Sequence, residues 1–152
     1  MSKLASKNDH EKLKEFYKKA YGMTHILNDS THTEWQFQKN PFNTIDGFSL
    51  VIVENDNQII AHLGFIPVEL KFLDSTKVAV WHVSLYTLED FRGKGLGTKM
   101  IKLSNCYGDL SMVLSGSDGT KKIYENLDGK DLGNMNRYIA ILNKKRISDF
   151  VT

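Results

Sequence analysis

A cluster of glycines and basic residues offers the clearest chemistry in the chain. Gly93, Gly95 and Gly97 alternate with other residues directly after Arg92, and Lys94 lies between the first two. Glycine is costly where a helix begins, so three of them indicate that bare backbone is needed there. The first turn of a helix offers unpaired N–H groups and the positive end of the dipole, which together bind anions. The pattern therefore predicts a loop that holds phosphate groups.

The segments on both sides of this loop fit that interpretation. An apolar run before it ends at Leu88 and reads as the end of a strand, and a short acidic turn follows. After the loop, apolar residues at i, i+4, i+7 and i+11 predict a helix: Leu96, Met100, Leu103 and Tyr107. The order is thus strand, glycine loop, helix. A Walker loop is absent, and the glycine spacing differs from that of a dinucleotide fingerprint.

The loop resembles the pyrophosphate-binding signature of the GCN5-related N-acetyltransferases, Arg/Gln-x-x-Gly-x-Gly/Ala. Arg92, Gly95 and Gly97 match it position by position. A helix that packs closely on a sheet would explain one glycine but not three. The resemblance implies acetyl-CoA as the acyl donor, with its pantetheine arm and thioester carbonyl on the strand end at Leu85, Tyr86 and Thr87. It implies a pyrophosphate contact for Arg92, Gly93, Lys94, Gly95, Leu96, Gly97 and Thr98.

The same resemblance suggests a catalytic acid. Such enzymes commonly protonate the leaving thiolate with a tyrosine in the pattern hydrophobic-Tyr-x-x-hydrophobic-Gly-Phe. The run Ile123–Leu127 matches the first half and makes Tyr124 the candidate, whereas Asp128–Lys130 departs from the ending. Ser117 stands where the family usually has an asparagine. The alternative role for Tyr124 is a core tyrosine on an amphipathic helix.

His82 is the candidate general base. Its unperturbed pKa suits proton transfer near neutrality, and it lies on the strand from which the family often supplies a base. A strand histidine is also a common structural residue, and ordered water deprotonates the amine in many such enzymes. Glu89 and Asp90 in the acidic turn fit better as caps or as partners of Arg92.

A region before the sheet supplies candidates for binding the acceptor. The segment Trp35–Pro41 resembles a Trp…Asn-Pro element that some family members carry near the acceptor side of the cleft. His25, His32 and Trp35 are the acceptor-site candidates. We expect a helix over Thr33–Lys39 with Trp35 as its large apolar contact. The competing interpretation is a surface loop pinned by Trp35.

Length and composition set broad limits. The 152 residues predict a single domain over 1–152 that is large enough to bury its own core. Twenty basic and eighteen acidic residues leave a net charge of +2, which gives no reason to expect nucleic acid or membrane as a partner. The single Cys106 and the lack of an apolar leader favour the cytoplasm. No metal-ligand spacing is found, and a homodimer stays open.

The remaining patterns predict the element order. We expect a short edge strand over Met1–Ala5, a helix capped at Asn8 or Asp9, the second helix, and then mostly antiparallel strands. These strands are Leu50–Glu54, Ile59–Phe65, Val68–Phe72 and Val78–Leu88, with a bulge that swaps the faces of the last. After the loop helix we expect a strand over Ser111–Ser115, a helix that carries Tyr124, and strands at Asp131–Gly133 and Met135–Leu142.

This order indicates a single α/β (α+β) domain with helices on both faces of a mixed, mostly antiparallel sheet. The resemblance adds that its two central parallel strands splay apart and admit pantetheine. It implies an N-acyltransferase, most simply one that moves acetyl from acetyl-CoA to a primary amine of a small molecule, an amino sugar included. Transfer to a protein amine, transfer of another acyl group, and a CoA-binding or regulatory module without catalysis are the alternatives.

Overall fold

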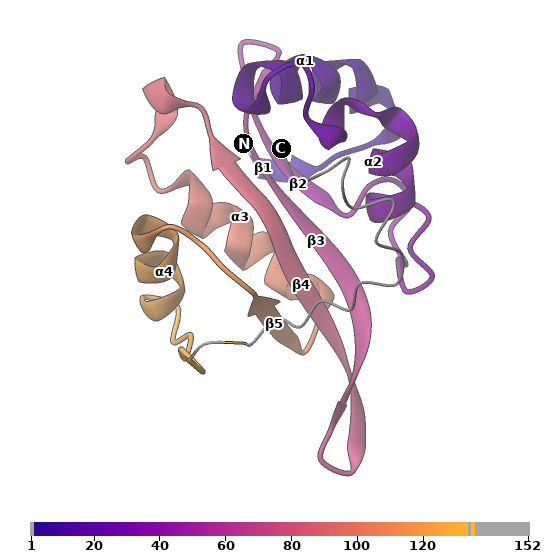
Figure 1. Cartoon of the computed structure of the whole chain (residues 1–152), viewed down its shortest axis with the longest axis vertical. Helices are drawn as coiled ribbons and strands as arrows, with labels where there is room; N and C mark the ends of the chain where they lie inside the picture. The colour runs from indigo at the N-terminus through magenta and orange to yellow at the C-terminus, as the bar shows by residue number, and fades with distance from the viewer. Residues whose placement is uncertain (1, 134, 136–152) are drawn as a thin grey trace, which may run out of the picture.

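The computed structural model describes residues 2–133 and 135, and these form one mixed sheet flanked by helices (Figure 1). The strand order is β1-β2-β3-β4-β5. The first three neighbouring pairs are antiparallel, and β4 and β5 are parallel. The strands are β1 Ser2–Leu4, β2 Leu50–Asn55, β3 Gln58–Phe72, β4 Ser75–Thr87 and β5 Leu110–Val113. The α-helices are α1 His10–Tyr21, α2 Ser30–Phe37, α3 Leu96–Ser104 and α4 Asp118–Glu125.

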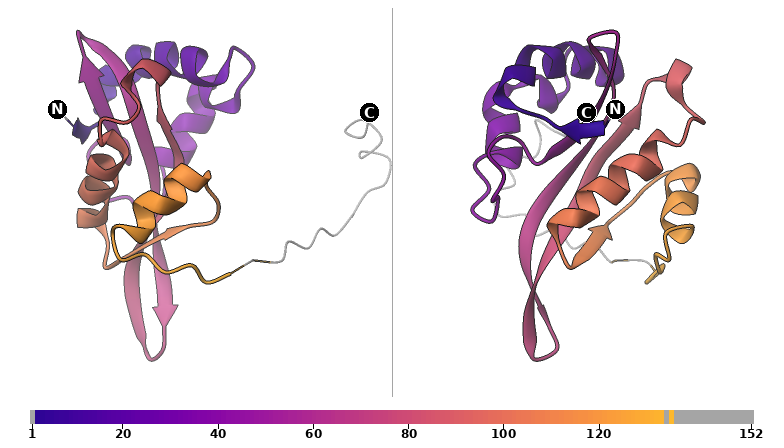
Figure 2. Two further views of the ribbon diagram at one scale, coloured as in Figure 1. Left: turned by 90° about the vertical axis from the view of Figure 1, so that its left-hand side faces the viewer. Right: turned by 180° about the vertical axis from the view of Figure 1, so that it is seen from behind.

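The helices lie in two layers, with α1 and α2 over one face of the sheet and α3 and α4 over the other (Figure 2). Each layer encloses its own hydrophobic core because strand residues alternate between the two faces. On β2, Leu50 and Ile52 join the α1 side, whereas Val51 and Val53 join the α3 side. The predicted α/β architecture with helices on both faces is confirmed.

A bulge in β4 decides which of its residues face which helices. The register against β3 shifts between His62 and Gly64, and Ser84 has a φ of +55°. Before the bulge, Val80 packs into the core on the α3 side; after it, Leu85 does so. Tyr86 packs instead into the core on the α1 side. The sequence-based prediction of a face-swapping bulge is confirmed.

Strand β3 is longer than the sequence suggested. Two strands, Ile59–Phe65 and Val68–Phe72, were expected with a bend or bulge marked by Gly64 and Pro67, but β3 is one strand. Its antiparallel ladder with β4 carries the chain through both residues, although the register irregularity lies beside Gly64. A Cβ at Gly64 would lie 2.5 Å from the Phe37 ring, so this glycine makes room for α2. The β3–β4 hairpin then projects beyond the other strands (Figure 1).

The second helix was predicted out of phase. It begins at Ser30, where the Asp29 side chain accepts hydrogen bonds from the N–H groups of Thr31 and His32, and it ends at Phe37. Thr33 and Phe37, one turn apart, face inward, whereas Trp35 lies two residues from each and is 65% exposed. Trp35 as the main apolar contact is therefore wrong.

The C-terminal strand predictions have different outcomes. Asp131–Gly133 is not a strand, and the Asp131 carboxylate accepts hydrogen bonds from Lys121 and from the Gly133 N–H. The strand predicted at Met135–Leu142 lies, apart from Met135, outside the described residues. Over the described part of the chain, no helix is long and apolar enough to cross a membrane.

Candidate active site

The glycine loop forms the N-terminal end of α3. Gly93 and Gly95 have φ values of +74° and +71°, a left-handed conformation that strains residues with a side chain. Gly95 is the N-cap of α3, so the N–H groups of the next three residues have no partner within the helix. A Cβ at either glycine would meet nothing within 4 Å, so the bare backbone faces open space. These features fit a bound pyrophosphate, although the structure carries no ligands.

Gly97 has a different reason to be glycine. It lies inside the first turn of α3, and a Cβ there would lie 3.0 Å from Cδ1 of Ile123 on α4. The missing side chain therefore lets α3 and α4 approach closely. Its backbone N–H remains one of the first-turn donors. The three glycines thus serve two needs: loop conformation at Gly93 and Gly95, and helix packing at Gly97.

The basic side chains of the loop are tied to its own backbone. Arg92 donates from Nε to the carbonyl of Thr87 at 3.0 Å and pairs with Glu89 at 3.2 Å. Its guanidinium carbon lies 5.5 Å from the centre of the Tyr86 ring. Lys94 donates from Nζ to the carbonyl of Asp90 at 3.1 Å. Arg92 thereby joins the loop to the end of β4. Its ion pair with Glu89 is the one that the sequence suggested.

Strand β4 extends beyond its parallel partner β5 beside this loop. Within the described residues, β5 pairs with β4 only from Ala79 to His82. The following β4 residues, which include Leu85, Tyr86 and Thr87, have no β5 partner in that part of the chain. In Figure 1 the chain after β5 turns away from β4 towards α4, whereas β4 continues. The parallel pair predicted from the family resemblance is present, and β4 extends beyond the end of β5.

His82 contacts Tyr124, and it is the last β4 residue that pairs with β5. The Nδ1 atom of His82 lies 2.8 Å from the Tyr124 hydroxyl, although the residues are 42 positions apart. On the other side of the ring, Nε2 lies 2.8 Å from the hydroxyl of Ser104, the last residue of α3. His82 and Ser104 are buried and Tyr124 is half-buried. The structure therefore joins the two catalytic candidates and adds a third residue.

Burial sets the protonation states of this cluster. It lowers the pKa of His82 to about 4, because the charged ring would lose its hydration. It raises the pKa of Tyr124 to about 12, because the charged phenolate would be desolvated in the same way. At neutral pH the pair is thus a neutral imidazole and a neutral phenol. His82 can accept a proton there, and Tyr124 can donate one.

The acceptor candidates separate into two places. His25 stacks on Tyr21 with ring centres 4.5 Å apart, and Tyr21 lies 5.1 Å from Tyr86 on the α1 side of β4. His32 and Trp35 contact each other on α2, with ring centres 5.7 Å apart. His25 is thus joined to the unpaired end of β4 through aromatic rings, whereas no ring contact between described residues joins His32 or Trp35 to that cluster.

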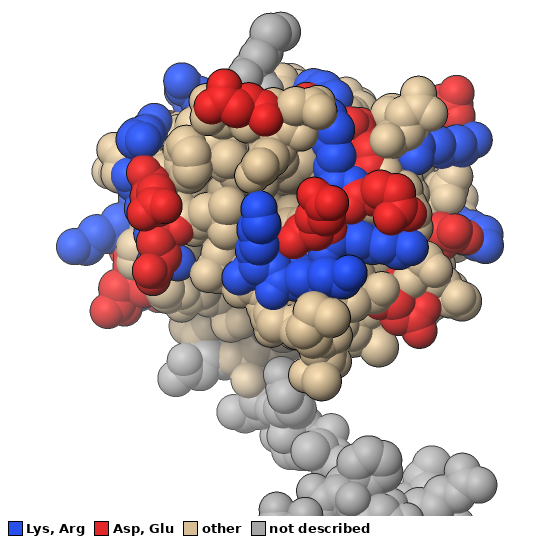
Figure 3. Space-filling view, turned by 90° about the horizontal axis from the view of Figure 1, so that it is seen from above, with Lys and Arg blue, Asp and Glu red and all other residues tan. Residues whose placement is uncertain are grey.

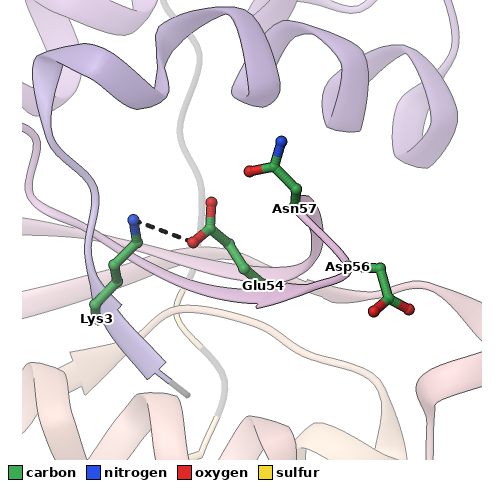
Figure 4. A pocket seen from close by; sticks show the side chains of 4 residues that line it. All are labelled: Lys3, Glu54, Asp56 and Asn57. Carbon is green, nitrogen blue, oxygen red and sulfur yellow. Dashed lines mark ion pairs between the residues drawn. The ribbon is translucent and has the colours of Figure 1, made fainter.

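One surface hollow lies away from these residues. It has a volume of about 450 Å³ and is lined by Lys3 of β1 and by Glu54, Asp56 and Asn57 at and beside the β2–β3 turn (Figure 4). Lys3 and Glu54 already form an ion pair at 3.1 Å. Neither the glycine loop nor Tyr124 lines it. The face shown in Figure 3 mixes charges of both signs, in keeping with the small net charge.

A comparison with protein-family models decides the family. Residues 7–104 match the model described as the acetyltransferase (GNAT) family. The chain belongs to this family. The match ends at Ser104, so β5 and the helix with Tyr124 lie beyond it. A search of curated protein sequences returns no match.

Solved structures agree with the family assignment at the level of the fold. Glucosamine-6-phosphate N-acetyltransferase from Arabidopsis thaliana is 20% identical, with a TM-score of 0.50 over 60% of this chain and 66% of its own. AAC(6')-Iy, bound to the bisubstrate analog CoA-S-monomethyl-acetylneamine, is 13% identical, with a TM-score of 0.68 over 93% and 97%. Ribosomal-protein-alanine N-acetyltransferase from Brucella melitensis is 13% identical, with a TM-score of 0.66 over 93% and 99%.

Sequence reasoning missed Ser104, Tyr21 and His62. Ser104 reads as an ordinary polar residue at a helix end, and the sequence carries no signal of its contact with His82. Tyr21 is the last residue of α1, and its hydroxyl lies 2.7 Å from Nε2 of His62 on β3. A histidine in an otherwise apolar strand was the one available signal for His62, which is fully buried.

Proposed function

We propose that this GNAT protein transfers the acetyl group of acetyl-CoA to a primary amine of a small molecule, with amino sugars as the first class to test. The observation that carries the proposal is the convergence of three features at one end of β4. They are the bare glycine backbone at the start of α3, the extension of β4 beyond β5, and the Tyr124 hydroxyl held by His82.

In this proposal acetyl-CoA is the donor substrate, and the loop from Arg92 to Thr98 holds its pyrophosphate. First-turn N–H groups and the helix dipole favour that charge, and the positive φ of Gly93 and Gly95 shapes the loop. The backbone from Leu85 to Thr87, which lacks a β5 partner among the described residues, is available for the pantetheine amides.

Tyr124 is the proposed acid that protonates the departing thiolate. A pKa of about 12 keeps the phenol protonated at neutral pH, as an acid requires. His25, with Tyr21 and Tyr86, is the proposed acceptor side, because these rings cluster on the α1 side at the same unpaired end of β4. The proposed acceptor side leaves out His32 and Trp35, because these residues of α2 contact each other and no ring contact between described residues joins them to that cluster.

The names of similar structures suggest two classes of acceptor, a small amine and a protein terminus. One similar structure is named for glucosamine-6-phosphate and another for ribosomal-protein alanine. The mixed surface charge and the small net charge give no sign of a peptide-binding face. We therefore place a small amine before a protein terminus. An assay with glucosamine 6-phosphate, neamine and a peptide that begins with alanine, each with acetyl-CoA, separates these classes by CoA release.

CoA binding is tested with paired glycine variants. Gly95→Ala and Gly22→Ala both place a side chain at positive φ, +71° and +86°, in open space. Gly95 is left-handed helical, so its substitution should cost about 1–2 kcal/mol of stability. Gly22 has a ψ of 169°, a region that almost only glycine adopts, so its substitution should cost at least as much. Calorimetric titration should show CoA affinity at least tenfold weaker for Gly95→Ala and unchanged for Gly22→Ala. Equal affinities in the two folded variants would remove the loop from CoA binding. CoA binding without acetyl transfer to any amine would instead favour a non-catalytic module.

A further inference from the structure

The hydrogen bonds around His82 favour one position for the ring proton. The Ser104 hydroxyl has one hydrogen and lies 2.9 Å from the carbonyl of Ile101, which can only accept it. In the arrangement that satisfies this carbonyl, the same oxygen accepts from Nε2 of His82 at 2.8 Å. Nε2 then carries the ring proton, and Nδ1 of the neutral ring is left with a lone pair.

The same logic fixes the direction of the Tyr124 hydroxyl. Its partner at 2.8 Å is the bare Nδ1 of His82, so the phenol donates its proton to the ring. The order of donation runs from Tyr124 to His82, from His82 to Ser104, and from Ser104 to the Ile101 carbonyl. A third group that sets the tautomer of a histidine is the arrangement that activates catalytic triads.

We propose that Ser104 and His82 are positioning residues that make Tyr124 a two-way proton carrier, so that one hydroxyl serves as both base and acid. This inference rests on the proposed acetyl transfer. It gives His82, the candidate base named from the sequence, a route to the amine: His82 accepts the proton through Tyr124.

The proton movements balance across the reaction. The amine nitrogen attacks the thioester carbonyl carbon to form the C–N bond, and the C–S bond breaks with its electron pair on sulfur. The nitrogen must lose one proton and the sulfur must gain one. The amine proton passes to the Tyr124 oxygen while the phenol proton passes to Nδ1 of His82. The imidazolium then returns its proton to the Tyr124 oxygen, which gives one to the thiolate.

The charge that forms on His82 has partners in the structure. While His82 is protonated, Nδ1 donates to the Tyr124 oxygen and Nε2 still donates to Ser104, so neither N–H is left unpaired in the buried site. Burial keeps the resting ring neutral at working pH, so the lone pair of Nδ1 is available. The same burial disfavours the imidazolium, so the protonated ring is a transient that returns its proton to the Tyr124 oxygen.

The first arm of the test needs no acceptor. In ¹⁵N spectra of the full chain at pH 7, His82 should show a protonated Nε2 and an unprotonated Nδ1, with its signals identified by their loss in His82→Gln. Ser104→Ala removes the acceptor for Nε2–H, so we expect the proton to shift measurably towards Nδ1. A protonated Nδ1 in the wild-type protein would overturn the proposal.

The second arm measures turnover with whichever amine of the panel is acetylated. Ser104→Ala should lower kcat roughly tenfold or more, with little change in KM for acetyl-CoA, because the effect falls on proton transfer. Ser49→Ala is the matched control: Ser49 is also fully buried and donates to a backbone carbonyl, that of Phe37. This control should keep wild-type kcat. Ser104→Cys, which fills the volume but accepts poorly, should repeat the loss if the alanine variant unfolds.

A double variant separates positioning from a general structural role. If Ser104 acts only through Tyr124, then adding Ser104→Ala to Tyr124→Phe should leave kcat where Tyr124→Phe alone puts it. Losses that multiply would overturn the proposal, as would wild-type kcat in Ser104→Ala. If no amine is acetylated, the proposed function fails, whereas the spectra still decide the hydrogen-bond order.

Discussion

Two histidine–tyrosine pairs lie on opposite faces of the same sheet. His82 on β4 meets Tyr124 of α4, and His62 on β3 meets Tyr21 of α1, with N–O distances of 2.8 and 2.7 Å. Both histidines are buried, and burial lowers the pKa of each. Chemically the pairs are alike, so their differences must lie in the remaining contacts.

The second ring nitrogen distinguishes the pairs. Nε2 of His82 is held by Ser104, whereas Nδ1 of His62 has no hydrogen-bond partner among the described residues. The Tyr21 hydroxyl also lies 3.3 Å from the carbonyl of Ser84 at the bulge, so it can divide its donation. The His82–Tyr124 pair thus continues to one further partner, Ser104. The His62–Tyr21 pair instead contacts the backbone at the bulge and packs in the core. In the proposed mechanism, control of the His82 tautomer, and not proximity alone, distinguishes the His82–Tyr124 pair.

The largest expected effect is an acid-sensitive stability from both histidines. Their pKa values fall to about 4 for His82 and about 3 for His62, below the ordinary 6.5. Below pH 6.5 these histidines therefore bind protons in the unfolded chain but stay neutral in the folded chain. The free energy of unfolding falls as the pH falls. The loss stops near pH 4 for His82 and near pH 3 for His62. A shift of this size for His82 corresponds to about 3 kcal/mol.

Denaturant unfolding between pH 7 and pH 3 checks this prediction. His82→Gln and His62→Gln should each have a flatter pH dependence than the wild-type protein, and the His62 variant should differ from it down to lower pH. Parallel curves for all three proteins would show that neither histidine is buried in its neutral form.

The next effect separates the pairs by turnover. Tyr124→Phe removes only the hydroxyl and should lower kcat roughly a hundredfold or more, the usual contribution of a positioned acid. Tyr21→Phe makes the same change in the other pair and should cost far less in kcat. Steady-state kinetics with a panel amine measure both. Similar losses in kcat would mean that the contrast between the pairs is not catalytic.

The converse effect should appear in stability. Tyr21→Phe leaves Nε2 of buried His62 without its partner, in addition to the unpaired Nδ1. An unsatisfied buried polar group costs about 1–3 kcal/mol, so thermal or denaturant unfolding should show a loss in that range. Tyr124 is half-buried, and water can replace its hydroxyl more readily, so Tyr124→Phe should lose less. The reverse ranking would break the comparison.

Local patterns predicted one part of the site, and long-range contacts supplied the rest. The glycine loop was predictable because spacing, helix start and preceding strand lie within one short segment around Gly93 and Gly95. The contact between His82 and Tyr124 spans 42 positions and depends on how α4 returns over the sheet. Nothing local encodes that return, so each residue was named separately and their bond was not foreseen.

The errors have similar physical origins. Trp35 was placed inward because it is the large apolar residue of its segment, and the Asp29 cap, which starts the helix three residues earlier, was not recognised. Strand β3 was divided because Gly64 and Pro67 were taken as marks of a bend or bulge, whereas pairing with β4 continues beyond both. Strand pairing is a tertiary effect that overrides local propensity.

The smallest expected effect tests whether the His82–Tyr124 pair depends on the packing of α4. Gly97→Ala would place a Cβ 3.0 Å from Cδ1 of Ile123, the residue before Tyr124. That atom is the end of a flexible side chain, so the contact is relieved by a small movement. Alanine also favours a helix over glycine by about 1 kcal/mol, so overall stability should change little.

Turnover should nevertheless respond, because a shift of α4 changes how Tyr124 approaches His82 and leaves the pair on the α1 face untouched. We expect kcat to fall a few-fold in Gly97→Ala, with CoA affinity retained because the backbone N–H is unchanged. Gly116→Ala is the comparison variant, since a Cβ there would lie 2.9 Å from Thr120, four residues before Tyr124 on α4. A tenfold loss of CoA affinity in Gly97→Ala would instead place the bare Cα of Gly97 against the phosphates, as the sequence motif alone suggested.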